Sequence, residues 1–162
     1  MSEEMVTVNM TVNGEPVSKT IPVRTHLVDF IRTELGFTGS HLGCEHGVCG
    51  ACSVSVDGDV VRGCLMLAAQ AEGADVMTIE GITDTGEIAD LQDKFVERNA
   101  LQCGFCTPGM LMTIAELMER KPDASRDEIR KFISGNYCRC TGYQAIVDAV
   151  EITREKKELQ HD

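Results

Sequence analysis

Eight cysteines form two groups of four in this chain of 162 residues. The first group has the spacing C-x4-C-x2-C-x11-C, and the second pairs a C-x2-C with a distant C-x-C. In order, the two groups are Cys44, Cys49, Cys52 and Cys64, then Cys103, Cys106, Cys138 and Cys140. Four thiolates are a complete ligand set for a metal centre. The spacing therefore predicts two separate centres in one chain.

The first group has the spacing of a plant-type 2Fe-2S site, because C-x4-C-x2-C is the order of ligands in that loop. Its cysteines lie among Gly39, Gly43, Gly47 and Gly50. Glycines let the backbone turn sharply, so that N–H groups can face the negatively charged sulfurs. A zinc site is the alternative, but this is not a usual zinc spacing, and a set of disulfides is weaker still.

The second group precedes two expected helices. Cys103 and Cys106 stand before a helix with Thr107 as its expected N-cap and Pro108 as its first residue, and Cys138 and Cys140 stand before one capped by Thr141. The partial positive charge of two helix N-termini would favour thiolates and an anionic cluster. Taken alone, this group could also bind zinc. The neighbouring iron-sulfur group favours a second cluster.

Residues 1–80 should form an α/β unit that positions the first group. Apolar residues alternate over 6–12 and 17–23, on either side of Asn13-Gly14, and a second hairpin turns at Asp57-Gly58. A helix is expected over 26–35, a short one over 65–72 and a strand over 76–79. Together these elements predict a sheet that wraps around one helix.

Residues 81–162 should form a helical domain, after a linker over 81–87. Four apolar stripes begin near Ile88, Leu111, Ile129 and Ile146. Capping boxes are expected at Ser125 with Glu128 and at Thr141 with Gln144, and Lys121-Pro122 should end the second helix. The overall prediction is an α+β fold with two domains, 1–80 and 81–162.

Charge and hydropathy exclude several classes of partner. The net charge is -11 and no block of Lys or Arg occurs, which argues against nucleic acid and anionic membranes. No apolar run approaches the ~20 residues of a membrane span, and the N-terminus lacks the features of an export signal. We therefore expect a cytoplasmic protein whose cysteines bind metal, and a partner with a basic or apolar surface.

Three motifs resemble a known family. GCEHGVCGACSV begins at Gly43, LQCGFCTPGM at Leu101 and GNYCRCTGYQAIVDAV at Gly135. Together they resemble the small iron-sulfur subunit of the xanthine-oxidase class of molybdenum hydroxylases, as in carbon monoxide, nicotine and quinoline dehydrogenases. The resemblance covers nearly the whole chain and includes all eight cysteines.

The resemblance implies a fold and a place for each centre. The N-terminal half would be a ferredoxin-like β-grasp with its cluster toward a flavin subunit. The C-terminal half would be a four-helix bundle with a buried cluster toward molybdenum. Gln102 matches a glutamine that hydrogen-bonds molybdopterin, and Cys140 matches a second pterin contact. From the residues alone, Gln102 would be an ordinary polar turn residue.

The function implied by the resemblance is electron relay. A large subunit would carry molybdopterin cytosine dinucleotide, a medium subunit would carry FAD, and the complex would be a heterotrimer or a dimer of heterotrimers. No residue of this chain would make or break bonds in the substrate. The alternative is a stand-alone ferredoxin with two exposed clusters. The segment around Gln102 argues against it, because a free carrier has no use for a pterin contact.

Three charged or titratable residues near the cysteines carry weaker expectations. His41 and His46 flank the first group, where four cysteines already complete the ligand set, so both should lie at the surface or around the ligands. Arg139 lies between two predicted ligands and could stabilise cluster charge or contact the partner, or it could be a solvated spacer.

Overall fold

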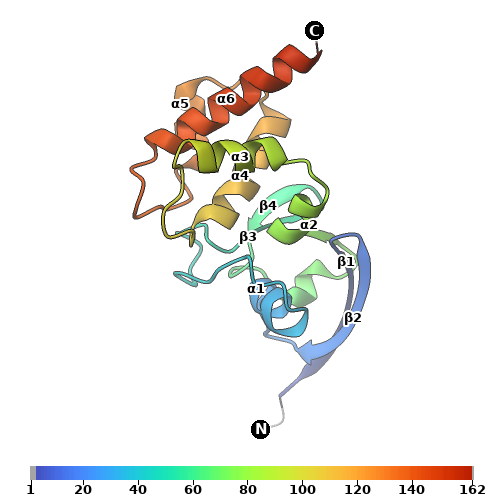
Figure 1. Cartoon of the computed structure of the whole chain (residues 1–162). Helices are drawn as coiled ribbons and strands as arrows, with labels where there is room; N and C mark the ends of the chain where they lie inside the picture. The colour runs from blue at the N-terminus through green and yellow to red at the C-terminus, as the bar shows by residue number, and fades with distance from the viewer. Residues whose placement is uncertain (1–2, 162) are drawn as a thin grey trace.

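The computed structural model describes residues 3–161, with side chains to residue 155. A five-stranded mixed sheet occupies the N-terminal half and helices occupy the C-terminal half (Figure 1). The β1–β2 hairpin lies at one end of the molecule and α6 at the other. This arrangement confirms the predicted α+β class.

Both predicted hairpins are present. β1 (Met5–Val12) pairs antiparallel with β2 (Glu15–Pro22), and β3 (Ser53–Val56) pairs antiparallel with β4 (Asp59–Arg62). The turn residues all have positive φ, at 53° and 82° for Asn13-Gly14 and 51° and 87° for Asp57-Gly58. Paired positive φ values favour a two-residue turn whose twist suits the strands, which is why Asn-Gly and Asp-Gly predict hairpins well.

β5 (Asp75–Met77) joins the two hairpins into one sheet. It runs parallel to β1 and antiparallel to β3, so that the strand order is β2-β1-β5-β3-β4. The strand ends two residues earlier than the 76–79 expected, because the chain turns at Thr78 into a helix.

The helix expected over 26–35 is divided. α1 (Leu27–Asp29) continues as the wider π-helical turn η1 (Phe30–Glu34), in which the Thr33 hydroxyl donates to the Asp29 carbonyl at 2.7 Å. Val28 packs against the cysteines of the first group, while the neighbouring apolar residues pack against the sheet. The segment is therefore buried on two sides.

Only part of the helix expected over 65–72 forms. The segment is the 3-10 helix η2 (Ala68–Ala71), and the residues before it pair with the chain at 25–27. Leu27 N–H donates to the Met66 carbonyl at 2.7 Å, and Leu67 bridges to His26. The Leu65 N–H donates to the Arg62 carbonyl at 2.9 Å in a turn, and the bonds to 25–27 fix Met66 and Leu67, so a helix cannot begin there.

The predicted linker 81–87 is wrong in its first part, where α2 (Ile79–Asp84) forms. Its glycine is a packing feature, because a Cβ on Gly81 would overlap the Asn13 side chain. The Glu80 carboxylate accepts from the Gly39 N–H at 2.7 Å and ties α2 to the first cysteine loop. The Gly/Thr/Asp-rich composition of this segment thus predicts a loop, but its first part packs as a helix.

The four predicted apolar stripes all lie on helices. These are α3 (Ala89–Glu97), α4 (Thr107–Arg120), α5 (Arg126–Ile133) and α6 (Gln144–His161). α3 packs on α6, α4 on α5, and α5 on α6. The Ser125 capping box is confirmed, with the Ser125 N–H donating to Glu128 at 2.9 Å.

Two predicted helix starts need correction. Cys106, rather than Thr107, occupies the N-cap of α4. α6 begins at Gln144, so Thr141 is not its cap. The Thr141 hydroxyl instead contacts the Cys138 sulfur and accepts from the Tyr143 N–H, each at 3.2 Å. The Thr141 hydroxyl therefore makes its hydrogen bonds within the cysteine loop and does not cap α6.

The buried apolar residues form two main clusters. One lies between the sheet and α1, and the other lies among the helices. The sheet cluster includes Val8, Val12, Ile31, Val54 and Val76, and the helical cluster includes Leu91, Phe95, Ile114, Leu117, Ile129 and Val150. Cys138 of the second group packs against the helical cluster, and Cys52 and Cys64 of the first form a third, small cluster with Val28.

Candidate iron-sulfur sites

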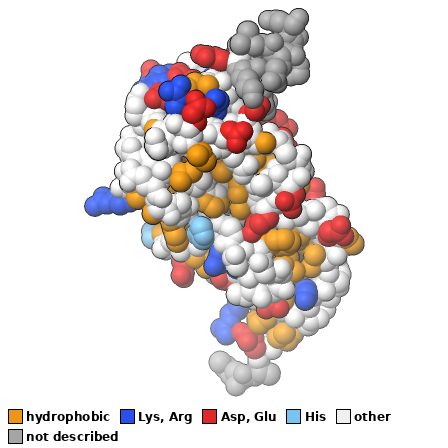
Figure 2. Space-filling model, in the orientation of Figure 1, with side chains coloured by type: hydrophobic (Ala, Val, Ile, Leu, Met, Phe, Trp, Pro, Cys, Tyr) orange, Lys and Arg blue, Asp and Glu red, His pale blue; other side chains and the backbone are white. Residues whose placement is uncertain are grey.

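Cys64 follows the β3–β4 hairpin, and three loops bring the other seven cysteines to one side of the molecule, on the left in Figure 1. They span residues 38–52, 99–106 and 134–143, between regular elements. On the same side, the space-filling view shows histidines beside apolar side chains (Figure 2). Two exposed residues of these loops are the apolar Val48 and Phe105.

The thiols of the first group meet in two pairs, Cys44 with Cys49 and Cys52 with Cys64. The Cys49 N–H lies 3.4 Å from the Cys44 sulfur. Backbone N–H groups of His46 and Cys49 lower the pKa of Cys44 to about 6. Burial raises the pKa of Cys52 to about 11. One pair is thus near the surface and the other is buried under Val28.

The second group also pairs two by two. The Cys103 and Cys140 sulfurs lie 3.6 Å apart, and Cys106 meets Cys138. Burial, together with the neighbouring thiols, raises the pKa of Cys106 to about 12. Burial also acts to raise the pKa of Cys138, but the Thr141 hydroxyl and backbone N–H groups outweigh it and lower that pKa.

The predicted burial of the second centre is wrong for the chain by itself. Cys103 and Cys140 are exposed, and Cys106 and Cys138 are only half-buried, whereas two thiols of the first group are fully buried. The helices cover one side of the group and leave the other open. Any further burial of these thiols must come from the bound centre or from another molecule.

The paired sulfurs fit a 2Fe-2S cluster, in which four thiolates are shared between two irons. A zinc ion would instead draw four ligands to one point at about 2.3 Å. Among the described residues, no three His, Cys, Asp or Glu side chains converge as ligands of a single ion. This geometry disfavours the zinc alternative at both groups.

The glycines of the first loop allow the sharp backbone turns that the sequence predicts. Gly47 and Gly50 have φ of +82° and +75°, in the left-handed region that favours glycine. A Cβ on Gly43 would lie 3.1 Å from the Cys49 sulfur. Side chains at these positions would twist the loop or crowd the ligands.

Gln102 links the two loops of the second group. Its Nε2 donates to the Cys140 carbonyl at 3.1 Å, and the residue is exposed. The side chain is therefore more than an ordinary turn residue, because it holds the Cys103 loop against the Cys140 loop. Its predicted contact with a pterin remains a prediction.

His41 connects the two groups rather than flanking one of them. Its ring stacks on Phe105 with centroids 4.6 Å apart, and Nδ1 lies 2.8 Å from the Phe105 carbonyl oxygen. His46 stays within the first loop, with Nδ1 at 2.5 Å from the Cys44 carbonyl oxygen. Arg139 is exposed, as expected for either of its predicted roles.

Asn136 and Arg62 are site residues that the sequence does not reveal. Asn136 is 1% exposed and lies two positions before Cys138. Arg62 ends β4 and donates to the Asn136 Oδ1 at 3.1 Å and to the Gly135 carbonyl at 3.0 Å. The only available signal was a polar residue close to a ligand, which is a weak one.

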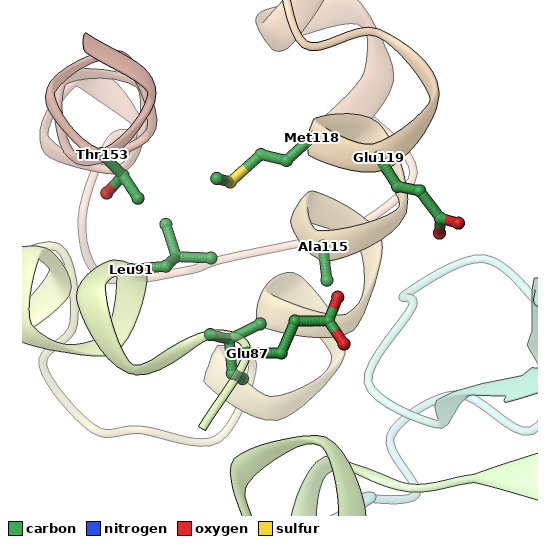
Figure 3. Close-up of a pocket in the computed structure, with 7 residues that line it drawn as sticks. Glu87, Leu91, Ala115, Met118, Glu119 and Thr153 are labelled. Atoms are coloured by element: carbon green, nitrogen blue, oxygen red, sulfur yellow. The ribbon is translucent and has the colours of Figure 1, made fainter. Parts of the chain in front are cut away.

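An open cavity of about 400 Å³ lies beside α5, lined by Ile133, Tyr137 and Tyr143 among others, and smaller cavities lie elsewhere. One of about 170 Å³ lies among α3, α4 and α6, where Leu91, Ala115, Met118 and Thr153 point inward and Glu87 and Glu119 lie at its edge (Figure 3). Pockets for drug-sized ligands usually begin near 300 Å³. No cysteine lines this cavity, so it is separate from the candidate sites.

Two family models match the chain in sequence. One described as "2Fe-2S iron-sulfur cluster binding domain" matches residues 10–78, and one described as "[2Fe-2S] binding domain" matches residues 78–151. Each match contains one cysteine group. Among the described residues, no helix has the length and hydropathy needed to cross a membrane.

Known proteins resemble the chain over almost its full length. The caffeine dehydrogenase subunit gamma of Pseudomonas sp. (strain CBB1) is 50% identical, covering 94% of this chain and 93% of that protein. The nicotine 6-hydroxylase small subunit of Paenarthrobacter nicotinovorans is 47% identical, covering 91% and 88%. The quinoline 2-oxidoreductase structure from Pseudomonas putida 86 superposes with a TM-score of 0.89 at 44% identity, covering 96% and 97%.

Proposed function

Since this chain belongs to the small iron-sulfur subunits of the molybdenum hydroxylases, we propose that its eight cysteines hold two 2Fe-2S clusters. The first would bind to Cys44, Cys49, Cys52 and Cys64, and the second to Cys103, Cys106, Cys138 and Cys140. Each cluster, when bound, accepts and releases one electron at a time. The chain carries electrons within an oxidoreductase complex.

The observation that carries this proposal is the pairing of the thiols. In both groups the four sulfurs meet as two pairs, as two irons with two thiolates each require. The protein contributes the position of the ligands, their burial and the hydrogen bonds to sulfur, and these set the reduction potential. The half-buried first group and the open second group provide unlike surroundings.

We further propose that the second site faces a large subunit with molybdopterin cytosine dinucleotide and the first site a medium subunit with FAD. Exposed Cys103, Cys140 and Gln102 support the first contact, because a partner would complete their burial. The exposed apolar Val48 and Leu65 beside the first loop support the second. The complex would be a cytoplasmic heterotrimer or a dimer of heterotrimers.

The fold is proposed to divide as the cysteines do. Residues 1–80 would form a ferredoxin-like β-grasp domain and residues 81–162 a four-helix bundle, with α2 as the connection. The separate hydrophobic clusters support this division. Each domain would contain one complete set of ligands.

Metal analysis tests the two-cluster proposal. The purified chain should contain about four irons and no zinc, because two 2Fe-2S clusters hold two irons each. After reduction, paramagnetic resonance should resolve two distinct signals, since the two groups have different burial. One cluster signal together with one zinc per chain would contradict the proposal.

Gln102→Ala and Gln102→Glu test the pterin contact. Glutamate keeps the shape of the side chain but lacks the Nε2 donor, so both variants lose the bond to the Cys140 carbonyl. Loss of a net hydrogen bond costs about 1 kcal/mol, or up to ~3 if it leaves a buried group unpaired. Both clusters should assemble, while molybdenum content or substrate-driven cluster reduction should fall in the complex. Normal values for both quantities would remove Gln102 from the functional residues.

A further inference from the structure

One backbone hydrogen bond connects the two cysteine groups. The Tyr137 N–H donates to the Cys49 carbonyl at 2.8 Å. Cys49 belongs to the first group, and Tyr137 precedes Cys138 of the second. From sulfur to sulfur, this connection uses only main-chain and Cβ atoms and a single hydrogen bond.

We propose that electrons cross between the two sites through this hydrogen bond, and that Asn136 is the positioning residue that holds it. The inference rests on the proposed two-cluster assignment. In the step, one electron leaves the reduced cluster at the second site and reduces the oxidised cluster at the first. No bond forms or breaks and no proton moves.

The alternative connection through His41 is longer. Its Nδ1 meets the Phe105 carbonyl, but the path then follows the side chain and several peptide units before it reaches Cys44. Electronic coupling falls with every bond added to a path and falls faster across a gap between atoms. The Cys49–Tyr137 bond therefore offers the stronger coupling of the two.

The Asn136 side chain makes four hydrogen bonds around this connection. Its Nδ2 donates to the Gly109 carbonyl at 2.8 Å and to the Gly50 carbonyl at 3.3 Å. Its Oδ1 accepts from Arg62 and from the Thr113 hydroxyl, each at 3.1 Å. These partners belong to the first loop, to α4 and to β4. A single buried amide thus fixes the residue before Tyr137 against the residue after Cys49.

Hydrogen exchange on the native holo chain is the first test. Tyr137 is 56% exposed and lies in a loop, where an amide without a partner exchanges quickly. If the bond to Cys49 persists, the Tyr137 amide should instead be strongly protected. Exchange at the rate of an open loop would overturn the proposal, and this result needs no variant.

Asn136→Asp is the second test, made in the assembled complex. It keeps the acceptor for Arg62 and Thr113 but places an oxygen against the carbonyls of Gly50 and Gly109. The magnetic interaction between the two reduced clusters should weaken. Transfer between the sites should slow, because the electron must then cross a gap between atoms where the hydrogen bond was.

The matched control is Asn9→Asp, which alters an amide bound to Glu72 within the first half and away from both loops. It should leave the coupling and the transfer rate unchanged. Tyr137→Pro removes the N–H donor itself and should slow transfer in the same way as Asn136→Asp.

Unchanged coupling and rate in Asn136→Asp or Tyr137→Pro, with both cluster signals present, would overturn the proposal. If both variants lose a cluster, Asn136→Ser and the hydrogen exchange of the native chain decide it. A native chain without two cluster signals would instead contradict the proposed function, so the two failures are distinguishable.

Discussion

Cys44→Ser is expected to abolish the first centre and to leave the second one intact. Cys44 belongs to one of the two thiol pairs of the first group, and the helical core contains no residue of that loop. Distant, independent sites respond separately to mutation. The variant should lose about half of its iron and one of its two paramagnetic signals, and α3 to α6 should stay folded.

In the assembled complex, this change should stop electrons before they reach the flavin. Substrate would still reduce the second centre, so the remaining signal should appear at its usual rate. Cys106→Ser is the reciprocal control, because it removes a ligand of the other group and should eliminate the other signal. Flavin reduction at the normal rate in Cys44→Ser would show that the proposed order of the two centres is wrong.

Gly50→Ala is expected to disrupt the contact between the two cysteine loops. Gly50 has φ of +75°, and an added Cβ would lie 2.6 Å from the Gly135 carbonyl oxygen and 2.7 Å from the Asn136 side chain. Left-handed strain costs roughly 1–2 kcal/mol and forced overpacking a further ~1–3 kcal/mol. The free energy of unfolding of the holo chain should therefore fall by about 2–5 kcal/mol, as urea titration would measure.

Gly58→Ala separates the two contributions. Gly58 has φ of +87° in the Asp57-Gly58 turn, but a Cβ there would meet nothing within 4 Å. Gly58→Ala should lower the free energy of unfolding only by the ~1–2 kcal/mol of backbone strain, and it should leave both cluster signals unchanged. Equal losses in the two variants would mean that Gly50 is needed for its backbone conformation and that its close contact with 135–136 is unimportant.

Local chemistry explains which elements could be predicted. The Asn13-Gly14 and Asp57-Gly58 turns and the Ser125 capping box depend on residues within four positions of each other, and all of them form. The four helices could also be predicted, because the apolar residues of each repeat with helical spacing along a single segment. These features do not need the rest of the chain.

Contacts between distant segments explain the errors. The helix over 79–84 was predicted as a linker because of Gly81. In the structure this position must be glycine, because the Asn13 side chain lies where a Cβ would be. The segment 65–67 does not form a helix because it is bonded to 25–27. Thr141 fits a helix cap by spacing, but its hydroxyl is engaged by the Cys138 sulfur. In the first two cases a partner far away in the sequence overrides the local preference, and in the third the competing partner is a cysteine three positions earlier.

The sequence by itself determined the two groups of four cysteines and their separation between the two halves, and it predicts them as ligands because ligand type and spacing reflect the chemistry of the centre. Only the tertiary structure decided how the thiols pair, which pair is buried, and that Asn136 and the Cys49–Tyr137 bond join the two sites. The residues that form these two sites come from distant parts of the chain, between Cys44 and Cys140. Their distances depend on how the sheet packs against the helices, and no spacing along the chain records that packing.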